Sequence, residues 1–264
     1  MCNLNVIVKS KIKDRIIKSL PAFLMGVTKS SYNFNSDGDG IYLDNKNKLF
    51  KGKKKVNVYK FEDDIYKSNF IITHQRIATS GFDAKYSQPF MDNDFVIAHN
   101  GVITELSTIS KSDTFVFFKQ FTKKFKLLEG EREFKIIESI KSVVENLEGY
   151  GSYSIVIFDK KTKILYYFKN NGTFIHFYTG HNILYITTSI NNDILLKTLD
   201  INFNEMEKIE NNIIYRICIK DDKIDIKTLS KIKPKERSYY NDNFNEFERN
   251  YYNDSDALRY YMNH

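Results

Sequence analysis

The stretch that decides the fold is residues 152–188, SYSIVIFDKKTKILYYFKNNGTFIHFYTGHNILYITT. Apolar and polar residues alternate along it with a period of two, and short polar turns such as residues 159–162 interrupt the alternation. This pattern is typical of strands that bury one face. It predicts four successive strands, at residues 152–159, 164–169, 173–178 and 183–188.

Strand-like patterns also occur on both sides of this region. They cover residues 3–8, 41–43, 70–74 and 95–99, and a last hairpin is predicted from residues 212–220 and 223–228. Apolar residues recur at helical spacing in residues 16–24, 112–124 and 131–147, where Pro21 marks a kink or the first turn of a second helix. Strands, then helices, then strands again predict an α+β fold with mostly antiparallel sheets.

Composition limits the class of protein. The chain has 264 residues, of which 42% are hydrophobic and 15% aromatic, so we expect a folded globular protein. No apolar run approaches the ~20 residues that span a bilayer, and the amino terminus lacks the features of a signal peptide. We therefore expect no membrane association and a cytoplasmic location.

Charge and cysteine content narrow the expected partners. The net charge is +7, but the lysines are mostly dispersed, and their one dense cluster, residues 51–55, lies in a predicted turn. A short lysine run of this kind is typical of a solvated turn, so nucleic acid is not expected as a partner. The only cysteines are Cys2 and Cys218, and no cysteines or histidines have metal-ligand spacing. We expect neither a metal nor a cofactor.

Cys2 is the candidate nucleophile. Removal of Met1 would leave Cys2 with a free α-amine, which titrates near 7.7–8.0. A terminal cysteine can then supply the thiol and the base that activates it from one residue. Alone, a cysteine at position 2 is better explained as an incidental terminal residue.

Four further segments change that interpretation. In chain order they are HQRIATSG (residues 74–81), AHNGVITE (98–105), SDT (112–114) and GSYSIV (151–156). Together with Cys2, they resemble the class II glutamine amidotransferases, which are amino-terminal-nucleophile hydrolases. The resemblance runs from residue 2 to about residue 190 and keeps the order of the family's motifs.

The resemblance implies roles for six residues. Cys2 would be the nucleophile, Asn100 and Gly101 would form the oxyanion hole, and the α-carboxylate and α-ammonium of L-glutamine would be bound by Arg76, Thr79 and Asp113. Each of the other assignments also has a simpler alternative. Arg76 could form a surface ion pair, Thr79 could be an ordinary strand residue, and Asn100-Gly101 could be a hairpin turn. Asp113 could be only a helix cap or a first-turn residue that interacts with the helix dipole. His74 and His99 are expected to be structural.

The family also implies a fold and a reaction. The fold is a four-layer αββα sandwich of two antiparallel sheets with helices outside. The reaction is hydrolysis of the glutamine amide through a Cys2 thioester, without a cofactor. Roughly seventy residues follow the last family-like strand, too few for a synthase domain. We therefore expect a separate ammonia-accepting synthetase, with residues 2–235 as the amidotransferase domain and residues 236–264 as a tyrosine-rich tail or docking helix.

The sequence departs from the family pattern in three places. Asn3 follows the nucleophile where the family usually has Gly, and residues 34–41, FNSDGDGI, lack the usual Arg. Ser80 follows Thr79 where some members of the family have His. These changes leave two alternatives open. The chain could hydrolyse a different γ-glutamyl amide, or it could be a non-catalytic interaction module of the same fold.

Overall fold

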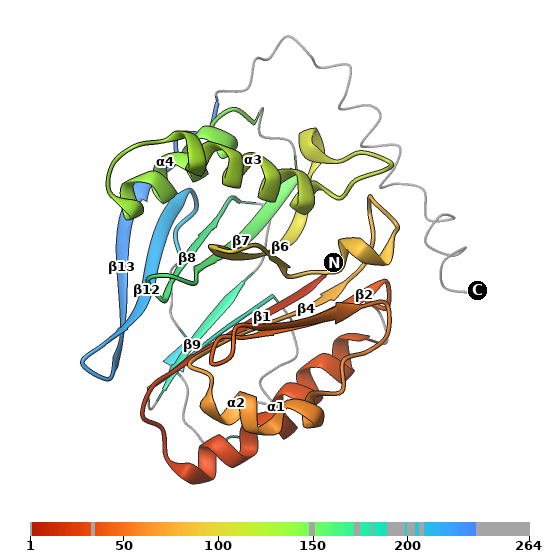
Figure 1. Ribbon diagram of the computed structural model, residues 1–264, viewed down its shortest axis with the longest axis vertical. Coiled ribbons are helices and arrows are strands. Elements are labelled where there is room, and N and C mark those ends of the chain that lie inside the picture. Colours follow the sequence, from red (N-terminus) through yellow and green to blue (C-terminus); the bar gives the residue numbers. More distant parts are fainter. Residues whose placement is uncertain are drawn as a thin grey trace.

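The computed structural model describes residues 2–32, 35–147, 151–171, 175–180, 182–188, 199, 204–205 and 209–235. Two β-sheets lie face to face, and helices cover the outer face of each sheet (Figure 1). The tail or docking helix expected at residues 236–264 lies outside the described residues, as do residues 173 and 174 of one predicted strand.

The first sheet, which carries the amino terminus, has seven strands within the described ranges. Their order is β11-β9-β10-β1-β4-β2-β3, and every neighbouring pair is antiparallel. The strands are β1 (Asn3–Lys9), β2 (Gly38–Leu43), β3 (Lys48–Gly52), β4 (Phe70–Arg76), β9 (His176–Gly180), β10 (Ile183–Thr187) and β11 (Asn204–Glu205). We call this sheet A.

The second sheet, sheet B, contains the hairpins predicted from the period-two region. Among the described residues its order is β13-β12-β8-β7-β6-β5, again antiparallel throughout. Its strands are β5 (Phe90–Met91), β6 (Phe95–Ile103), β7 (Gly151–Asp159), β8 (Ile164–Lys169), β12 (Ile213–Lys220) and β13 (Lys223–Lys231).

Helices form the two outer layers. They are α1 (Asp14–Tyr32) and α2 (Glu62–Lys67) over sheet A, and α3 (Asp113–Leu127) and α4 (Arg132–Val144) over sheet B, with short 3₁₀ turns η1 (Val58–Phe61), η2 (Ala84–Tyr86) and η3 (Thr104–Leu106). Pro21 lies inside the single helix α1, so the alternative of a second helix starting there is wrong. No helix in the described part of the chain is both long and apolar enough to span a membrane.

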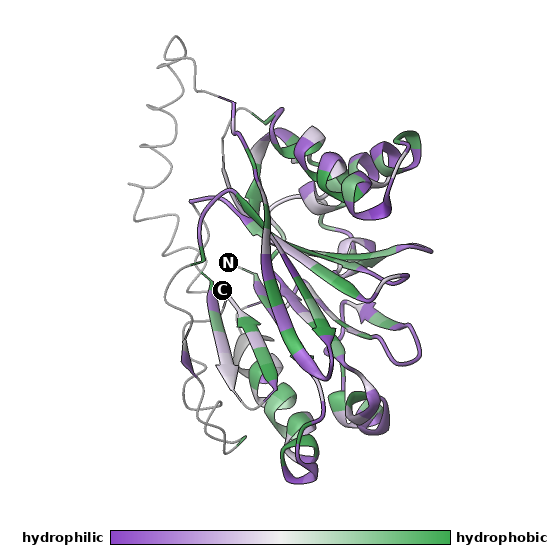
Figure 2. Cartoon of the chain, turned by 90° about the vertical axis from the view of Figure 1, so that its left-hand side faces the viewer, coloured by the Kyte–Doolittle hydropathy of each residue, from purple (hydrophilic) through white to green (hydrophobic). Residues whose placement is uncertain are grey.

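Three apolar clusters hold the four layers together. Alternate residues of β1 belong to different clusters: Leu4, Val6 and Val8 pack between the two sheets, whereas Ile7 packs under α1. The third cluster joins sheet B to α3 and α4 through residues such as Phe117 and Ile140. Hydrophobic and hydrophilic residues are accordingly mixed along the same helices and strands (Figure 2). The predicted α+β αββα sandwich is confirmed.

Candidate functional site

Cys2 lies immediately before β1, next to the end of β4. The pairing of Asn3 with Gln75 places it beside Arg76 and Ile77. The side chain is half-buried, and its Sγ accepts the N–H of Ile77 at 3.3 Å. The same Sγ lies 3.4 Å from the carbonyl oxygen of Ile77, to which the thiol can donate. The backbone of one residue therefore fixes the position of the sulfur.

The surroundings of Cys2 both raise and lower the pKa of its thiol. Burial raises the pKa of the thiol, because a thiolate loses hydration there. The N–H of Ile77 and the positive charges of the amino terminus and Arg76 lower that pKa, and the carboxylate of Asp113 raises it. Arg76 and Asp113 are thus close enough to influence the candidate nucleophile.

Arg76 is buried, with 3% of its surface exposed. Its Nη2 donates to the carbonyl oxygens of Ser80 and Gly81, the latter at 2.9 Å. Its Nη1 is also buried and has no hydrogen-bond partner among the described residues. The alternative of a surface ion pair is therefore wrong. A buried guanidinium with an unused donor is suited to binding a carboxylate.

Asn100 lies inside the continuous strand β6, so the alternative of a hairpin turn at Asn100-Gly101 is wrong. The side chain is 1% exposed, and neither Nδ2 nor Oδ1 has a hydrogen-bond partner in the described structure. A buried amide without partners costs about 1–3 kcal/mol per unpaired group, so native proteins keep few of them. An unpaired amide of this kind is a candidate ligand-binding group.

Cys2, Arg76 and Asn100 all face the space between the sheets. Leu4 and Ala98 belong to the apolar cluster between the sheets, and side chains two residues apart on a strand share a face. Cys2 therefore shares the face of Leu4, and Asn100 shares that of Ala98. His74, which pairs with Leu4, connects the two sheets here through a 2.9 Å contact between its Nε2 and the carbonyl oxygen of His99.

Gly101 has a backbone that only glycine tolerates. Its φ is +127°, and a Cβ would lie 2.1 Å from the carbonyl oxygen of Ser152. The N–H groups of its second neighbours, His99 and Ile103, donate to the side chains of Gln88 and Asp113 and not to β7. N–H groups alternate in direction along a paired strand, so the N–H of Gly101 points the same way as those of His99 and Ile103, which is away from β7.

Asp113 is the first residue of α3, and Ser112 is the helix N-cap. Its Oδ2 accepts the N–H of Ile103 at 2.9 Å, and its Oδ1 accepts the N–H of Thr114 at 2.6 Å. The carboxylate is buried and also lies 3.8 Å from Nδ1 of His99. Because Ser112 is the N-cap, the alternative of a helix cap at Asp113 is wrong. The carboxylate instead joins the end of β6 to the first turn of α3, and its charge still reaches Cys2 and Arg76.

Other residues near the site include some that the sequence singled out and one, Gln88, that it did not. Thr79 is exposed, whereas the adjacent Ser80 is buried with its Oγ unpaired among the described residues. Gln88, which the sequence did not single out, binds the N–H of His99 at 2.7 Å and the hydroxyl of Thr114 at 3.0 Å. Nothing in the residue types around Gln88 indicates this role, because its partners come from other segments. His74 and His99 are both buried.

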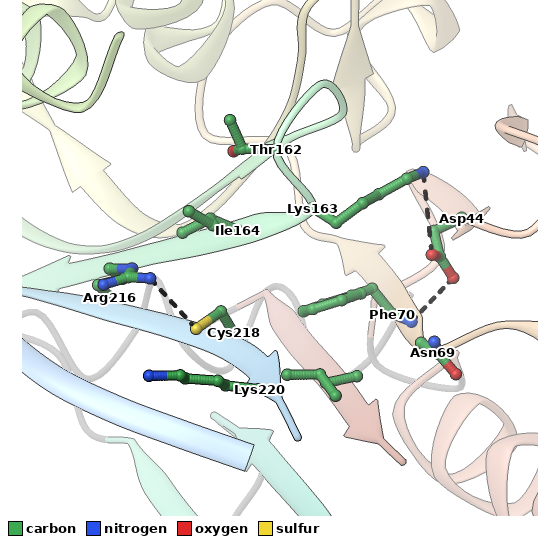
Figure 3. Close-up of a pocket in the computed structure, with 10 residues that line it drawn as sticks. Asp44, Asn69, Phe70, Thr162, Lys163, Ile164, Arg216, Cys218 and Lys220 are labelled. Carbon is green, nitrogen blue, oxygen red and sulfur yellow. Dashed lines mark hydrogen bonds and ion pairs between the residues drawn. The ribbon is translucent and has the colours of Figure 1, made fainter. Parts of the chain in front are cut away.

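A cavity of about 450 Å³ lies elsewhere in the fold (Figure 3). Its lining includes Asp44, Phe70, Lys163, Arg216 and Cys218. Phe70 pairs with Val8, which is six residues and therefore roughly 20 Å along β1 from Cys2. This cavity is not part of the candidate site.

Comparison with known proteins supports the fold. No family model matches the chain, and no curated protein matches its sequence. Among solved structures, the glutamine phosphoribosylpyrophosphate amidotransferase from B. subtilis, in complex with ADP and GMP, is similar with a TM-score of 0.56 at 17% identity. An allosteric regulatory enzyme of purine biosynthesis is similar with a TM-score of 0.55 at 14% identity.

Both alignments cover 87% of this chain but 49% of the other, so the chain spans about half the length of these proteins. At these identities the likeness concerns the fold. The fold of the amino-terminal-nucleophile glutamine amidotransferases, expected from the resemblance, is confirmed. The roles of the site residues remain predictions.

The backbone of Gly101 predicts a large and local effect on stability. Gly101→Ala should lower the free energy of unfolding by about 2–4 kcal/mol, because the new Cβ overlaps a carbonyl oxygen in a strained region of φ. Urea denaturation measures the change. Gly52→Ala is the control, because nothing lies within 4 Å of a Cβ there, and it should change the value by no more than about 0.5 kcal/mol. Equal effects of the two substitutions would contradict this account.

The charges around Cys2 predict a pH dependence with a defined sign. Arg76 lowers the pKa of the thiol, so Arg76→Met should move the pH profile of Cys2 alkylation by iodoacetamide to higher pH. Asp113 raises that pKa, so Asp113→Asn should move the profile to lower pH. Mass spectrometry of the Cys2 peptide gives the rates. Lys163→Met, at the distant cavity, should leave the profile in place. Shifts of the same sign in the first two variants would refute the arrangement.

Proposed function

We propose that this chain hydrolyses the side-chain amide of L-glutamine through a thioester on Cys2, freed of Met1, and that a separate synthetase uses the ammonia. The observation that carries the proposal is the buried amide of Asn100, whose two polar atoms are unpaired among the described residues. It faces the same space between the sheets as Cys2 and the buried Arg76. The glutamine amidotransferase-like fold supports the same chemistry.

Substrate binding uses the two charged groups. The Nη1 of Arg76, which is unpaired among the described residues, would donate to the α-carboxylate of glutamine. Asp113 would accept from the α-ammonium. Thr79, exposed beside the loop that holds Arg76, would add a hydroxyl. This arrangement directs the side chain of glutamine toward Cys2.

The first chemical step forms a bond between Sγ of Cys2 and the amide carbon of glutamine. The thiol proton passes to the α-amine of Cys2, which is the base nearest in the chain. The carbonyl oxygen becomes negative and accepts hydrogen bonds from Nδ2 of Asn100 and the N–H of Gly101. The carbon–nitrogen bond then breaks, and the α-ammonium of Cys2 returns its proton to the departing ammonia.

The second step regenerates the thiol. Water attacks the γ-glutamyl thioester with the α-amine again as base, and the same oxyanion donors stabilise the intermediate. Glutamate leaves and Cys2 recovers its proton. The ammonia would pass to a synthetase on another chain.

Intact-mass analysis with 6-diazo-5-oxo-norleucine, a glutamine analogue that alkylates such nucleophiles, tests the proposal directly. We expect the purified protein to lack Met1 and to gain one adduct, mapped to Cys2. Cys2→Ala should gain none. Cys218→Ala should gain one, because Cys218 lies on β12 and lines the distant cavity, which is not part of the candidate site. A retained Met1, or a processed Cys2 that never reacts, would overturn the proposed function.

The oxyanion role of Asn100 predicts a rate effect. Asn100→Ala should lower the turnover of glutamine about a hundredfold or more, with a smaller change in KM, because the lost donor acts in the transition state. A coupled glutamate assay measures both constants. Asn146→Ala, which removes an exposed amide bound to the carbonyl oxygen of Ser142, is the matched control and should retain the wild-type rate. A wild-type rate in Asn100→Ala would exclude this role.

A further inference from the structure

A row of buried polar side chains crosses the outer face of sheet A, behind Cys2. Nδ2 of Asn3 donates to Oε1 of Gln75 at 3.2 Å, and Nε2 of Gln75 donates to Oδ1 of Asp39 at 2.9 Å. Oδ2 of Asp39 accepts the N–H of Val56 at 2.7 Å. All three side chains are at least 97% buried. The row joins three neighbouring strands, β1, β4 and β2, to the segment after β3.

The row lies on the opposite face of the sheet from the candidate site. Asn3 lies between Cys2 and Leu4 in the chain, so its side chain points to the opposite face from theirs. Ile7 shares the face of Asn3, and Ile41 shares that of Asp39. Both isoleucines pack under α1. Within the sheet, Asn3 is directly opposite Gln75, and Gln75 is directly opposite Asp39. The hydrogen bonds therefore connect side chains that the strand register already brings together.

Polar groups in this position are costly compared with an apolar layer. Apolar residues of similar size would be at least as stabilising at a buried site, whereas buried polar pairs can specify one arrangement. A slip of β1 by one residue would turn Asn3 toward the apolar cluster between the sheets. A slip by two residues would place Asn3 opposite Thr73 and remove its bond to Gln75. The row thus favours a single register of β1 on β4.

That register is the one that places the site residues. Asn3 directly follows Cys2, and Gln75 directly precedes Arg76. Cys2 and Arg76 face the space between the sheets, and their chain neighbours are bonded on the other face. We infer that Asn3, Gln75 and Asp39 are positioning residues, which hold Cys2 at the distance from Arg76 that the reaction needs. This inference rests on the proposed function. It also assigns a role to Asn3, at which the sequence departs from the family pattern.

A second polar row nearby offers an internal comparison. Oδ1 of Asn5 accepts the hydroxyls of Tyr185 and Thr187, both at 2.8 Å, and its Nδ2 donates to Oγ1 of Thr73 at 3.3 Å. This row is also buried, but Asn5 lies two residues further from Cys2 along β1 than Asn3 does. Thr73→Val therefore removes a similar hydrogen bond without touching the row behind Cys2.

The first test exchanges the groups of the row. In Gln75→Glu, two carboxylates meet at positions 75 and 39, and the labelling rate of Cys2 by 6-diazo-5-oxo-norleucine should fall at least about tenfold. Combining it with Asp39→Asn restores the three bonds of the row: the carboxylate at 75 accepts from Asn3 and from the new amide at 39, whose oxygen accepts from Val56. The double variant should label within about fivefold of wild type.

Thermal unfolding and Thr73→Val separate positioning from general stability. Thr73→Val should lower the Tm but keep the labelling rate of the folded protein within about twofold of wild type. A Gln75→Glu protein that is folded and labels at the wild-type rate would overturn the inference. So would a folded double variant whose labelling stays as slow as that of Gln75→Glu.

A second test does not require glutamine binding, so it remains decisive if the proposed function is wrong. Arg76→Met should shift the pH profile of Cys2 alkylation by iodoacetamide in the wild-type background and clearly less in an Asn3→Leu background. The same shift in both backgrounds would show that Asn3 does not hold Cys2 near Arg76. The wild type could fail to form the 6-diazo-5-oxo-norleucine adduct while the Arg76→Met shift still differs between the two backgrounds. That result would reject the proposed glutaminase function and retain the positioning role of Asn3.

Discussion

The antiparallel pairing of β1 with β4 is the constraint on which the candidate site depends. β1 is a central strand with β10 on its other side, so its register is fixed from both edges. Pairing brings the residue before β1 next to the residues that end β4, and these are Cys2, Arg76 and Ile77. Under the proposed function, Cys2 is a terminal nucleophile after removal of Met1 and has only one covalent connection to the fold. The paired strand supplies the rigidity that a chain terminus otherwise lacks.

The interior of the sandwich is apolar along most of the β1–β4 pair and polar at the end near Cys2. Val6 and Val8 lie in an apolar cluster, whereas the end near Cys2 contains His74, Arg76 and Asn100, all buried. Charges and dipoles interact strongly where water is excluded, and unpaired polar groups there are costly. The three apolar clusters provide the stability that such an end requires. Under the proposed function, the same burial would strengthen the interaction of Arg76 with a charged ligand and of Asn100 with a developing oxyanion.

The sequence predicted the architecture well because its strands have regular alternation. Residues 152–159 and 164–169 were predicted as strands and lie in β7 and β8, with the turn between them as expected. The order of short motifs then predicted Cys2, Arg76, Asn100 and Gly101 as site residues, and the fold places the first two at sheet A and the last two on β6 of the facing sheet B. The burial of Arg76 could not be predicted, because it depends on the carbonyl groups of Ser80 and Gly81. Gln88 and the row from Asn3 to Asp39 were not predicted, because their bonds join segments far apart in the chain and leave no local pattern.

Asp113 shows why two interpretations of one residue need not exclude each other. A carboxylate has about four acceptor positions, and the N–H groups of Ile103 and Thr114 occupy one on each oxygen. The hydroxyl of Thr114, 3.3 Å from Oδ1, occupies a third. These bonds fix the carboxylate between β6 and α3, so its remaining lone pairs keep a constant direction. They also leave its charge in place, because both partners are neutral. Under the proposed function, an α-ammonium would then meet an anion that is already oriented, and little conformational entropy would be lost on binding. The helix start therefore supplies the rigidity that a binding role for Asp113 requires.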